Sequence, residues 1–302
     1  MKKFFKAIGP AVGYFIIYFV INIIVLFIGS LYLVIKAEVL AMTNPSLVET
    51  IPDIAEALKG SNIMLFSSVA SIIFLFVCWL IILCTNTPLK ERLELNPVSF
   101  RSFWPVIALG ITLNIFISQF LGSLPIPENV FNEYAQATSL LGNEITLVQI
   151  LSVVIVAPIV EEILYRGLIM KSLQIGMPVV IALIIQALIF GLMHGQLLWI
   201  CYATFLGVLL AIIRLRYKSL YPSILLHMSF NAANYILIPL YYLIPDNVFS
   251  NVILITVALI ISVFLGIVIF KKTNNTLYAN NISAENSGEF PNQETPEICL
   301  KE

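Results

Sequence analysis

The chain contains 302 residues, of which 60% are hydrophobic and only 11% charged, and its mean hydropathy is +0.98. Soluble globular domains carry about 25% charged residues, so this composition excludes an ordinary soluble domain. Several apolar runs reach the length of about 20 residues that a helix needs to span a bilayer, and the alternating pattern of a transmembrane β-barrel is absent. We therefore expect an all-α, polytopic transmembrane helical bundle in the cell membrane.

Eight membrane spans are predicted, because eight apolar segments are separated by polar, charged or proline-containing residues. In chain order they cover roughly residues 11–35, 63–84, 103–123, 145–172, 178–195, 196–214, 219–241 and 250–270. The fifth and sixth spans are nearly continuous, so Gly195 and Gln196 are expected either to form a tight hairpin or to join a slanted pair of helices. Residues 124–144 are interrupted by proline and then mildly amphipathic, which predicts a segment along the outer membrane interface.

These spans divide the chain into four regions. Residues 1–123 hold three spans without a buried charge, and we expect them to serve packing and lipid contact. Residues 145–241 contain the intramembrane polar groups described below, and residues 242–272 contain the last span. Residues 273–302 are rich in Asn, Ser, Glu and Pro and lack apolar periodicity, which predicts a disordered cytoplasmic tail.

The distribution of basic residues predicts that both termini are cytoplasmic. An even number of spans places the two termini on one side, and short cytoplasmic loops carry the excess of lysine and arginine. Fourteen basic residues fall on the side of the termini, against Lys36 and Lys59 on the other. The fourteen are Lys2, Lys3, Lys6, Lys90, Arg92, Arg101, Arg166, Lys171, Arg214, Arg216, Lys218, Lys271, Lys272 and Lys301.

Two adjacent carboxylates, Glu161 and Glu162, interrupt the fourth span. Ionisable side chains inside a bilayer are costly and usually face a polar cavity with a partner. Helix positions four apart share a face, so Glu162 is expected to pair with Arg166, whereas Glu161 points about 100° away. Glu162 is thereby predicted to support the architecture, and Glu161 is a candidate general base or acid. The alternative is that both glutamates lie near the interface and extend to water.

The only two histidines, His194 and His227, also lie in apolar segments. Phe190 precedes His194 by four residues and can pack beneath its imidazole, while Asn231 follows His227 by four and shares its helix face. Asparagine is a common donor to an oxyanion and a rare zinc ligand, so the pair favours oxyanion binding. Two alternatives remain open: packing for His194, and an interhelical hydrogen bond for His227 and Asn231.

Depth along the helices decides whether these side chains can meet. At about 1.5 Å per residue, Glu161, His227 and Asn231 lie about 15, 13 and 20 Å from the cytoplasmic ends of their helices. These depths are compatible with one cluster. Counted from Pro178, His194 lies about 24 Å in, nearer the outer face. Its helix must either tilt or begin below the membrane surface, and the sequence leaves both open.

The three fragments together resemble the CAAX-protease and bacteriocin-processing family of intramembrane proteases, which includes the Rce1-type prenyl-protein endopeptidases. The family's EExxxR motif reads here Glu161-Glu162-Ile163-Leu164-Tyr165-Arg166. Its FxxxH and HxxxN motifs read Phe190 to His194 and His227 to Asn231. The resemblance covers about residues 145–240 and implies a catalytic core that cleaves a membrane-associated, lipidated or peptide-precursor substrate.

The resemblance also implies a role for each motif residue. In that family the first glutamate and the FxxxH histidine are thought to activate water, and the HxxxN pair is thought to form the oxyanion hole. Carried over, Glu161 is the general base, His194 positions or deprotonates water, and His227 and Asn231 stabilise the oxyanion. Three residues would support this catalytic set: Glu162, Arg166 and Phe190.

Zinc is a second mechanistic possibility, because the family is often labelled a metalloprotease. Glu161, His194 and His227 could form a set of two histidines and one glutamate. The HExxH arrangement that makes zinc compelling is absent. We therefore expect catalysis without a metal or other cofactor.

Two further functions compete with proteolysis. One is a non-enzymatic membrane factor, such as a bacteriocin self-immunity or regulatory protein, that retains the motifs as structure. The other is a transporter with Glu161 as a proton relay, but the inverted repeat common in secondary transporters is missing. The expected partners are the lipid bilayer and a membrane protein or peptide substrate, and no nucleic acid.

Overall fold

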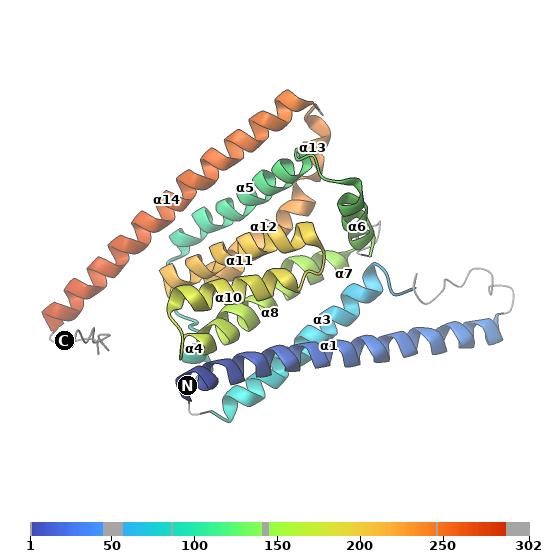
Figure 1. Cartoon of the computed structure of the whole chain (residues 1–302), viewed down its shortest axis with the longest axis horizontal. Helices are drawn as coiled ribbons and strands as arrows, with labels where there is room; N and C mark the ends of the chain where they lie inside the picture. Colours follow the sequence, from blue (N-terminus) through green and yellow to red (C-terminus); the bar gives the residue numbers. More distant parts are fainter. Residues whose placement is uncertain (1, 45–56, 86, 141–144, 246, 288–302) are drawn as a thin grey trace.

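In the computed structural model the chain is a bundle of long helices that run side by side (Figure 1). The structure describes residues 2–44, 57–85, 87–140, 145–245 and 247–287, and no strand occurs among them. The all-helical class predicted from the composition is therefore confirmed. The helices are α1 (Lys2–Thr43), α3 (Ser61–Leu83), α4 (Leu89–Arg92), η2 (Phe100–Ser102), α5 (Phe103–Gly122), α6 (Glu128–Ser139), α7 (Leu147–Ile150), η3 (Leu151–Val156), α8 (Ala157–Glu161), η4 (Glu162–Met170), α9 (Lys171–Leu173), α10 (Val179–Leu192), α11 (Leu197–Tyr217), α12 (Leu220–Ile236), α13 (Ile238–Leu243) and α14 (Val248–Ser287).

Six helical segments of the described chain are long and apolar enough to cross a membrane, so the protein is a multi-pass membrane protein. They cover Lys6–Thr43, Ser61–Leu83, Phe100–Gly122, Leu147–Leu173, Leu197–Tyr217 and Val248–Thr273. Helices also occupy the predicted fifth and seventh spans, but α10 has 14 residues and α12 has 17. At about 1.5 Å per residue both are shorter than the roughly 30 Å apolar core of a bilayer. The predicted count of eight spans is therefore not confirmed.

Both short helices end for identifiable reasons. The predicted seventh span extended to residue 241, but α12 stops at Ile236 because Pro239 enters the first turn of α13, where its missing N–H is tolerated. Helix α10 stops at Leu192 because a turn around Gly195 reverses the chain. Gly195 has φ +72°, a backbone conformation that favours glycine, and the predicted hairpin is confirmed there.

The fourth apolar segment, Leu147–Leu173, alternates between α-helix and the wider π-helix. Its two π-helical stretches are η3 and η4, and Pro158 lies in the short α-helix α8 between them. Proline has no N–H and its ring excludes the carbonyl four residues earlier, which explains a widened turn before it. Such π-helical turns are rare and often lie at functional sites. Here η4 carries Glu162 and Arg166.

Two clusters of buried apolar side chains hold the bundle together. One joins α1, α3, η4 and α10, and the other joins α5, α12 and α14; α11 contributes to both. Close approach of α10 and α11 depends on small residues. A side-chain carbon at Gly191 would collide with Thr204, and one at Gly207 would lie 3.1 Å from the ring of Phe190. Helix α10, which carries Phe190, is therefore packed against α11 at backbone contact.

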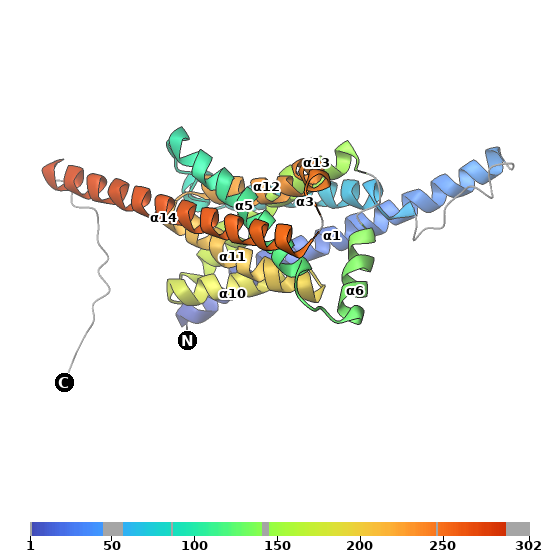
Figure 2. The ribbon, with the colours of Figure 1, turned by 90° about the horizontal axis from the view of Figure 1, so that it is seen from above.

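Two other segments bear on the sequence predictions. Helix α6, within the predicted interfacial segment, has no buried residue and lies across the direction of the long helices in both views (Figures 1 and 2). Its Tyr134 packs against Trp199 of α11 with ring centroids 5.8 Å apart. Helix α14 continues to Ser287, and the disordered tail for residues 273–302 stays a prediction. Residues 288–302 lie outside the described residues.

Candidate active site

The buried ion pair predicted in the fourth segment is present. Arg166 Nη1 lies 2.6 Å from Glu162 Oε1, and both side chains are completely buried. Arg166 Nη2 donates to the Gly207 carbonyl (3.1 Å), which also accepts from Gln186 Nε2 (3.2 Å). The guanidinium lies 4.4 Å from the ring centroid of Phe190. The pair therefore fixes η4 against both α10 and α11.

Glu162 also organises helix α12. Ser223 Oγ donates to Oε2 of Glu162, and His227 Nδ1 lies 3.1 Å from Oε1. A carboxylate oxygen only accepts, so the hydrogen of this ring bond resides on Nδ1. Glu162 thereby fixes the orientation of the imidazole and turns its Nε2 towards the neighbouring glutamate.

Glu161 occupies a different environment from Glu162. Its Oε2 lies 3.6 Å from His227 Nε2, and its side chain is 23% exposed whereas that of Glu162 is fully buried. Glu162 is thus fully engaged in the buried ion pair, whereas Glu161 presents a partly accessible carboxylate beside a histidine.

His194 lies in the turn that follows α10, not inside a helix. Its Nδ1 is 2.9 Å from the Phe190 carbonyl, which accepts a hydrogen bond, so a neutral ring keeps Nε2 as the proton acceptor. The Phe190 ring packs edge-on against both imidazoles, with centroid distances of 5.0 Å to His194 and 5.8 Å to His227. Helix α10 is short and ends at the level of the polar cluster. His194 therefore lies at the depth of the other motif residues. Among the described contacts, no hydrogen bond or ion pair joins His194 to Glu161.

Asn231 is anchored to the other π-helical stretch. Its Nδ2 donates to the Val153 carbonyl in η3 at 2.9 Å. A side-chain amide has two N–H groups, so this bond leaves one donor for another acceptor. His227 and Asn231 share a face of α12 as predicted from their spacing, and both face the fourth segment.

The zinc alternative does not fit this arrangement. Among the described residues, no three His, Cys, Asp or Glu side chains are grouped so that they could hold a metal ion. Zinc needs its nitrogen and oxygen ligands at about 2.0–2.2 Å from one point. Glu161 approaches His227 at 3.6 Å, but no contact between Glu161 and His194 occurs among the described residues. We derive no catalytic step through a metal.

Sequence reasoning missed three polar residues that surround the site. Ser223 precedes His227 by four residues, Gln186 precedes Phe190 by four, and Tyr165 follows Glu161 by four. Each therefore shares a helix face with a motif residue. A search for polar residues at this spacing from each motif would have found them.

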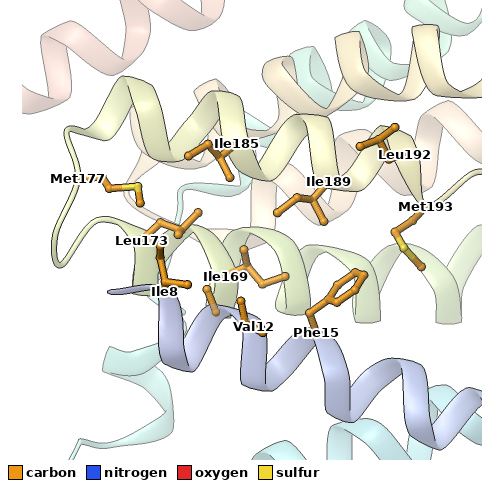
Figure 3. A pocket seen from close by; sticks show the side chains of 11 residues that line it. Ile8, Val12, Phe15, Ile169, Leu173, Met177, Ile185, Ile189, Leu192 and Met193 are labelled. Carbon is orange, nitrogen blue, oxygen red and sulfur yellow. The ribbon is translucent and has the colours of Figure 1, made fainter. Parts of the chain in front are cut away.

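An apolar cavity of about 420 Å³ adjoins the turn that carries His194. It lies between α1, the η4–α9 segment and α10, and Figure 3 shows Val12, Phe15 and Ile169 facing the α10 side chains Ile185 and Ile189. Leu192 and Met193 line its end next to the turn (Figure 3). The lining contains only hydrophobic residues, which suits a hydrocarbon chain.

The fold and site together define a multi-pass helical membrane protein whose core holds a carboxylate–histidine cluster. A family model described as type II CAAX prenyl endopeptidase, Rce1-like, matches residues 143–233. This range contains all three motifs, so the predicted resemblance to the CAAX protease family is confirmed over it. No curated protein matches the chain significantly, and no solved structure does.

The Ser223 hydroxyl is predicted to be a positioning group for Glu162. Ser223→Ala leaves one oxygen of a buried carboxylate without its donor, which costs about 1–3 kcal/mol of unfolding free energy. Ser223→Thr keeps the hydroxyl and is expected to recover most of this loss. Denaturant unfolding of the detergent-solubilised protein measures the difference. Ser229→Ala is the matched control, because that buried serine on the same helix donates to its own Leu226 carbonyl and to no other group among the described residues. Equal losses in the two alanine variants would contradict the prediction.

Proposed function

We propose that this protein is an intramembrane endopeptidase that hydrolyses a peptide bond of a membrane-associated substrate. The observation that carries the proposal is the pairing of Glu161 with His227 Nε2 at 3.6 Å, inside the segment that matches the Rce1-like family. Glu161 keeps access to water while its neighbour Glu162 is committed to the buried ion pair. A partly exposed carboxylate held beside a histidine is suited to general base catalysis.

In the proposed reaction, Glu161 removes a proton from water and the hydroxide attacks the scissile carbonyl carbon. The acceptor Nε2 of His194 positions the same water. The proton then passes from Glu161 to the amine as the carbon–nitrogen bond breaks, so the water is consumed and the base is restored. Acid–base catalysis of this kind contributes roughly 10²–10⁴-fold to a rate.

The tetrahedral oxyanion is assigned to His227 and Asn231. For this role His227 is the imidazolium, because its Nδ1–H already donates to Glu162. Its Nε2–H and the second N–H of the Asn231 amide then lie on one helix face, and both are donors. Each such donor is worth about 2.7–4 kcal/mol of transition-state stabilisation. Glu162 supports this pair, because its bond to Nδ1 fixes the ring, and the bond to Val153 holds Asn231.

The proposed substrate has an apolar part as well as a peptide bond. The cavity of about 420 Å³ beside His194 offers only hydrophobic contacts, so it suits a lipid chain or the apolar side chains of a peptide precursor. A bound hydrocarbon would hold the adjoining peptide near the polar cluster. We infer this substrate class from two sources, the resemblance to the CAAX protease family and the hydrophobic lining of the cavity.

The proposed topology places both termini in the cytoplasm. Basic residues from four separate helical segments, η2, α9, α11 and α14, meet at one end of the bundle. Lys171 and Arg214 both pair with Glu94 (3.2 and 3.0 Å), and Lys272 Nζ donates to the Arg101 carbonyl. An excess of lysine and arginine marks the cytoplasmic side.

A non-enzymatic immunity or regulatory role is the second candidate. It is favoured by one observation: the network of Glu162, Arg166 and Ser223 ties three helical segments together and would be retained for architecture alone. Under this alternative, substitution of Glu161 or His194 leaves the biological phenotype intact as long as the protein folds.

Comparison of new peptide N-termini in cell membranes tests the enzyme proposal and requires no identified substrate. Cells that express the wild type are expected to accumulate N-termini that are absent from cells with His194→Ala, because the variant lacks the group that positions water. Leu197→Ala is the matched control, since this exposed residue begins α11 just beyond the same turn. Terminal amine labelling and mass spectrometry measure the products. The same N-termini in both variants at equal protein levels would contradict the proposal.

A further inference from the structure

A second cavity, polar and basic, lies at one end of the bundle. It has a volume of about 330 Å³ and is bounded by the loop before α5 and by the ends of α11 and of the apolar part of α14. Arg216, Lys218 and Lys272 line it together with hydroxyl groups, and none of its described lining residues is acidic. Small-ligand sites occupy roughly 300–1,000 Å³, so the cavity is large enough for one.

The cavity lies where three membrane spans end. The span Phe100–Gly122 begins beside it, and the spans Leu197–Tyr217 and Val248–Thr273 terminate there. Helix α14 packs along α5 and reaches α11 (Figure 1). Phe100 and Trp104 are exposed at the same end, and aromatic residues are enriched at membrane–water interfaces. The cavity is therefore at the level of lipid headgroups.

Its basic side chains are held in place by the surrounding structure. Arg216 Nε donates to Thr273 Oγ1 (3.2 Å) and Nη2 donates to the Phe270 carbonyl (3.1 Å). The guanidinium stacks 4.6 Å from the Phe270 ring centroid. Lys272 Nζ donates to the Arg101 carbonyl at 2.9 Å, which fixes that ammonium against the loop.

Lys218 is positioned by its backbone. It ends α11 with φ 48°, a left-handed conformation uncommon for residues other than glycine, and its carbonyl accepts from Asn96 Nδ2 at 2.6 Å. The nearby carboxylate of Glu94 pairs with Arg214 and Lys171 and does not line the cavity. The surrounding structure thus holds the positively charged residues Arg216, Lys218 and Lys272 around the cavity.

We propose that this cavity binds the phosphate group of an anionic ligand at the membrane surface. Three cations together with the hydroxyls of Ser99 and Ser102 supply hydrogen-bond donors for the phosphate oxygens. Basic pockets between transmembrane helices bind anionic lipid headgroups through this chemistry. The same donors would also bind a soluble phosphate. The site is separate from the glutamate–histidine cluster and does not depend on the proposed proteolysis.

Orientation of the chain in the membrane is a simpler explanation for basic residues at this end. That explanation accounts for charge anywhere on one side of the membrane, but it requires neither a cavity nor hydroxyl groups. The two explanations differ in a measurable way. If the cavity is a binding site, affinity falls when the cations that line it are removed. If the cations serve only to orient the chain, what matters is the number removed and not their position.

Native mass spectrometry of the full chain in detergent, with phosphatidylglycerol or phosphatidylcholine added, tests the proposal. The variant Arg216→Gln/Lys218→Asn/Lys272→Gln is compared with the control Lys6→Gln/Lys90→Gln/Lys271→Gln, which removes equal charge from exposed lysines outside the cavity. Each cation contributes about fivefold, so the first variant is expected to bind phosphatidylglycerol roughly a hundredfold more weakly. The control is expected to bind as the wild type does.

Two further measurements keep the outcome decisive. Lys218→Asn/Lys272→Gln retains every contact of Arg216, tolerates the left-handed backbone, and should still lose roughly 25-fold. Inorganic phosphate is titrated as a competitor: displacement of the lipid at comparable concentration identifies a soluble phosphate ligand, and retention identifies the headgroup. Equal binding of the two lipids together with no effect of phosphate would overturn the proposal. So would equal loss in the control variant.

Discussion

Glu161→Gln is expected to abolish peptide hydrolysis, with a loss of roughly 10²–10⁴-fold in kcat, while the fold is unaffected. Glutamine preserves the size of the side chain but cannot accept a proton from water. Glu161 is the partly exposed member of the pair and has no cationic partner from arginine or lysine among the described contacts. Its only ionic contact there is with His227, 3.6 Å away. The charge can therefore be removed without leaving an unpaired cation in the core.

The neighbouring substitution Glu162→Gln provides the matched comparison. It changes the same chemical group one residue away, but it leaves the Arg166 guanidinium without its counter-ion in a fully buried position. We expect Glu162→Gln to lower stability and Glu161→Gln to lower only turnover. Cleavage of a substrate identified by its new N-terminus and thermal unfolding are measured on both proteins. A stable, fully active Glu161→Gln protein would exclude the proposed base.

Arg166→Met is expected to destabilise the protein by about 3–5 kcal/mol, because it leaves a buried carboxylate without its cationic partner. Methionine fills much of the space of the arginine stem and can retain contact with Phe190, so the loss reports mainly on charge. Gln186 continues to donate to the Gly207 carbonyl, which limits secondary damage. Denaturant unfolding in detergent measures the change in free energy.

Removing both charges together distinguishes pairing from packing. In Glu162→Gln/Arg166→Met no charge remains unpaired, and the single glutamine oxygen can still accept from either Ser223 or His227, which bond different oxygens of Glu162. The double variant is expected to be more stable than either single variant, with a coupling energy of about 0.5–3 kcal/mol. Strict additivity of the two losses would show that the ion pair is not the cause of the destabilisation.

Much of the site could be predicted because its signal is local. A helix places residues four apart on one face, and three predictions used that rule: Glu162 with Arg166, Phe190 with His194, and His227 with Asn231. The first is confirmed as an ion pair and the second as a ring contact supported by a backbone bond. Separation of the two glutamates followed from the 100° turn between adjacent helix residues.

Contacts between helices were beyond this reasoning. Spacing within α12 gave no indication that Ser223 would donate to a glutamate 61 residues earlier, or that Asn231 would donate to Val153 in a π-helical stretch. The count of eight spans is unconfirmed for a related reason. Hydropathy marked residues 178–195 as a span, but the turn at Gly195 and the close packing of Gly191 against Thr204 end α10 at Leu192.

By itself, the sequence determined that this chain is an all-helical membrane protein and which helix faces bear its chemical groups. Apolar length and the period of the helix are properties of a single segment, so composition and spacing reveal them. Only the tertiary structure decided that His227 bridges the two glutamates and that His194 reaches their depth from a short helix. These outcomes depend on how closely η4, α10, α11 and α12 approach one another, and that distance is set by packing between segments far apart in the chain.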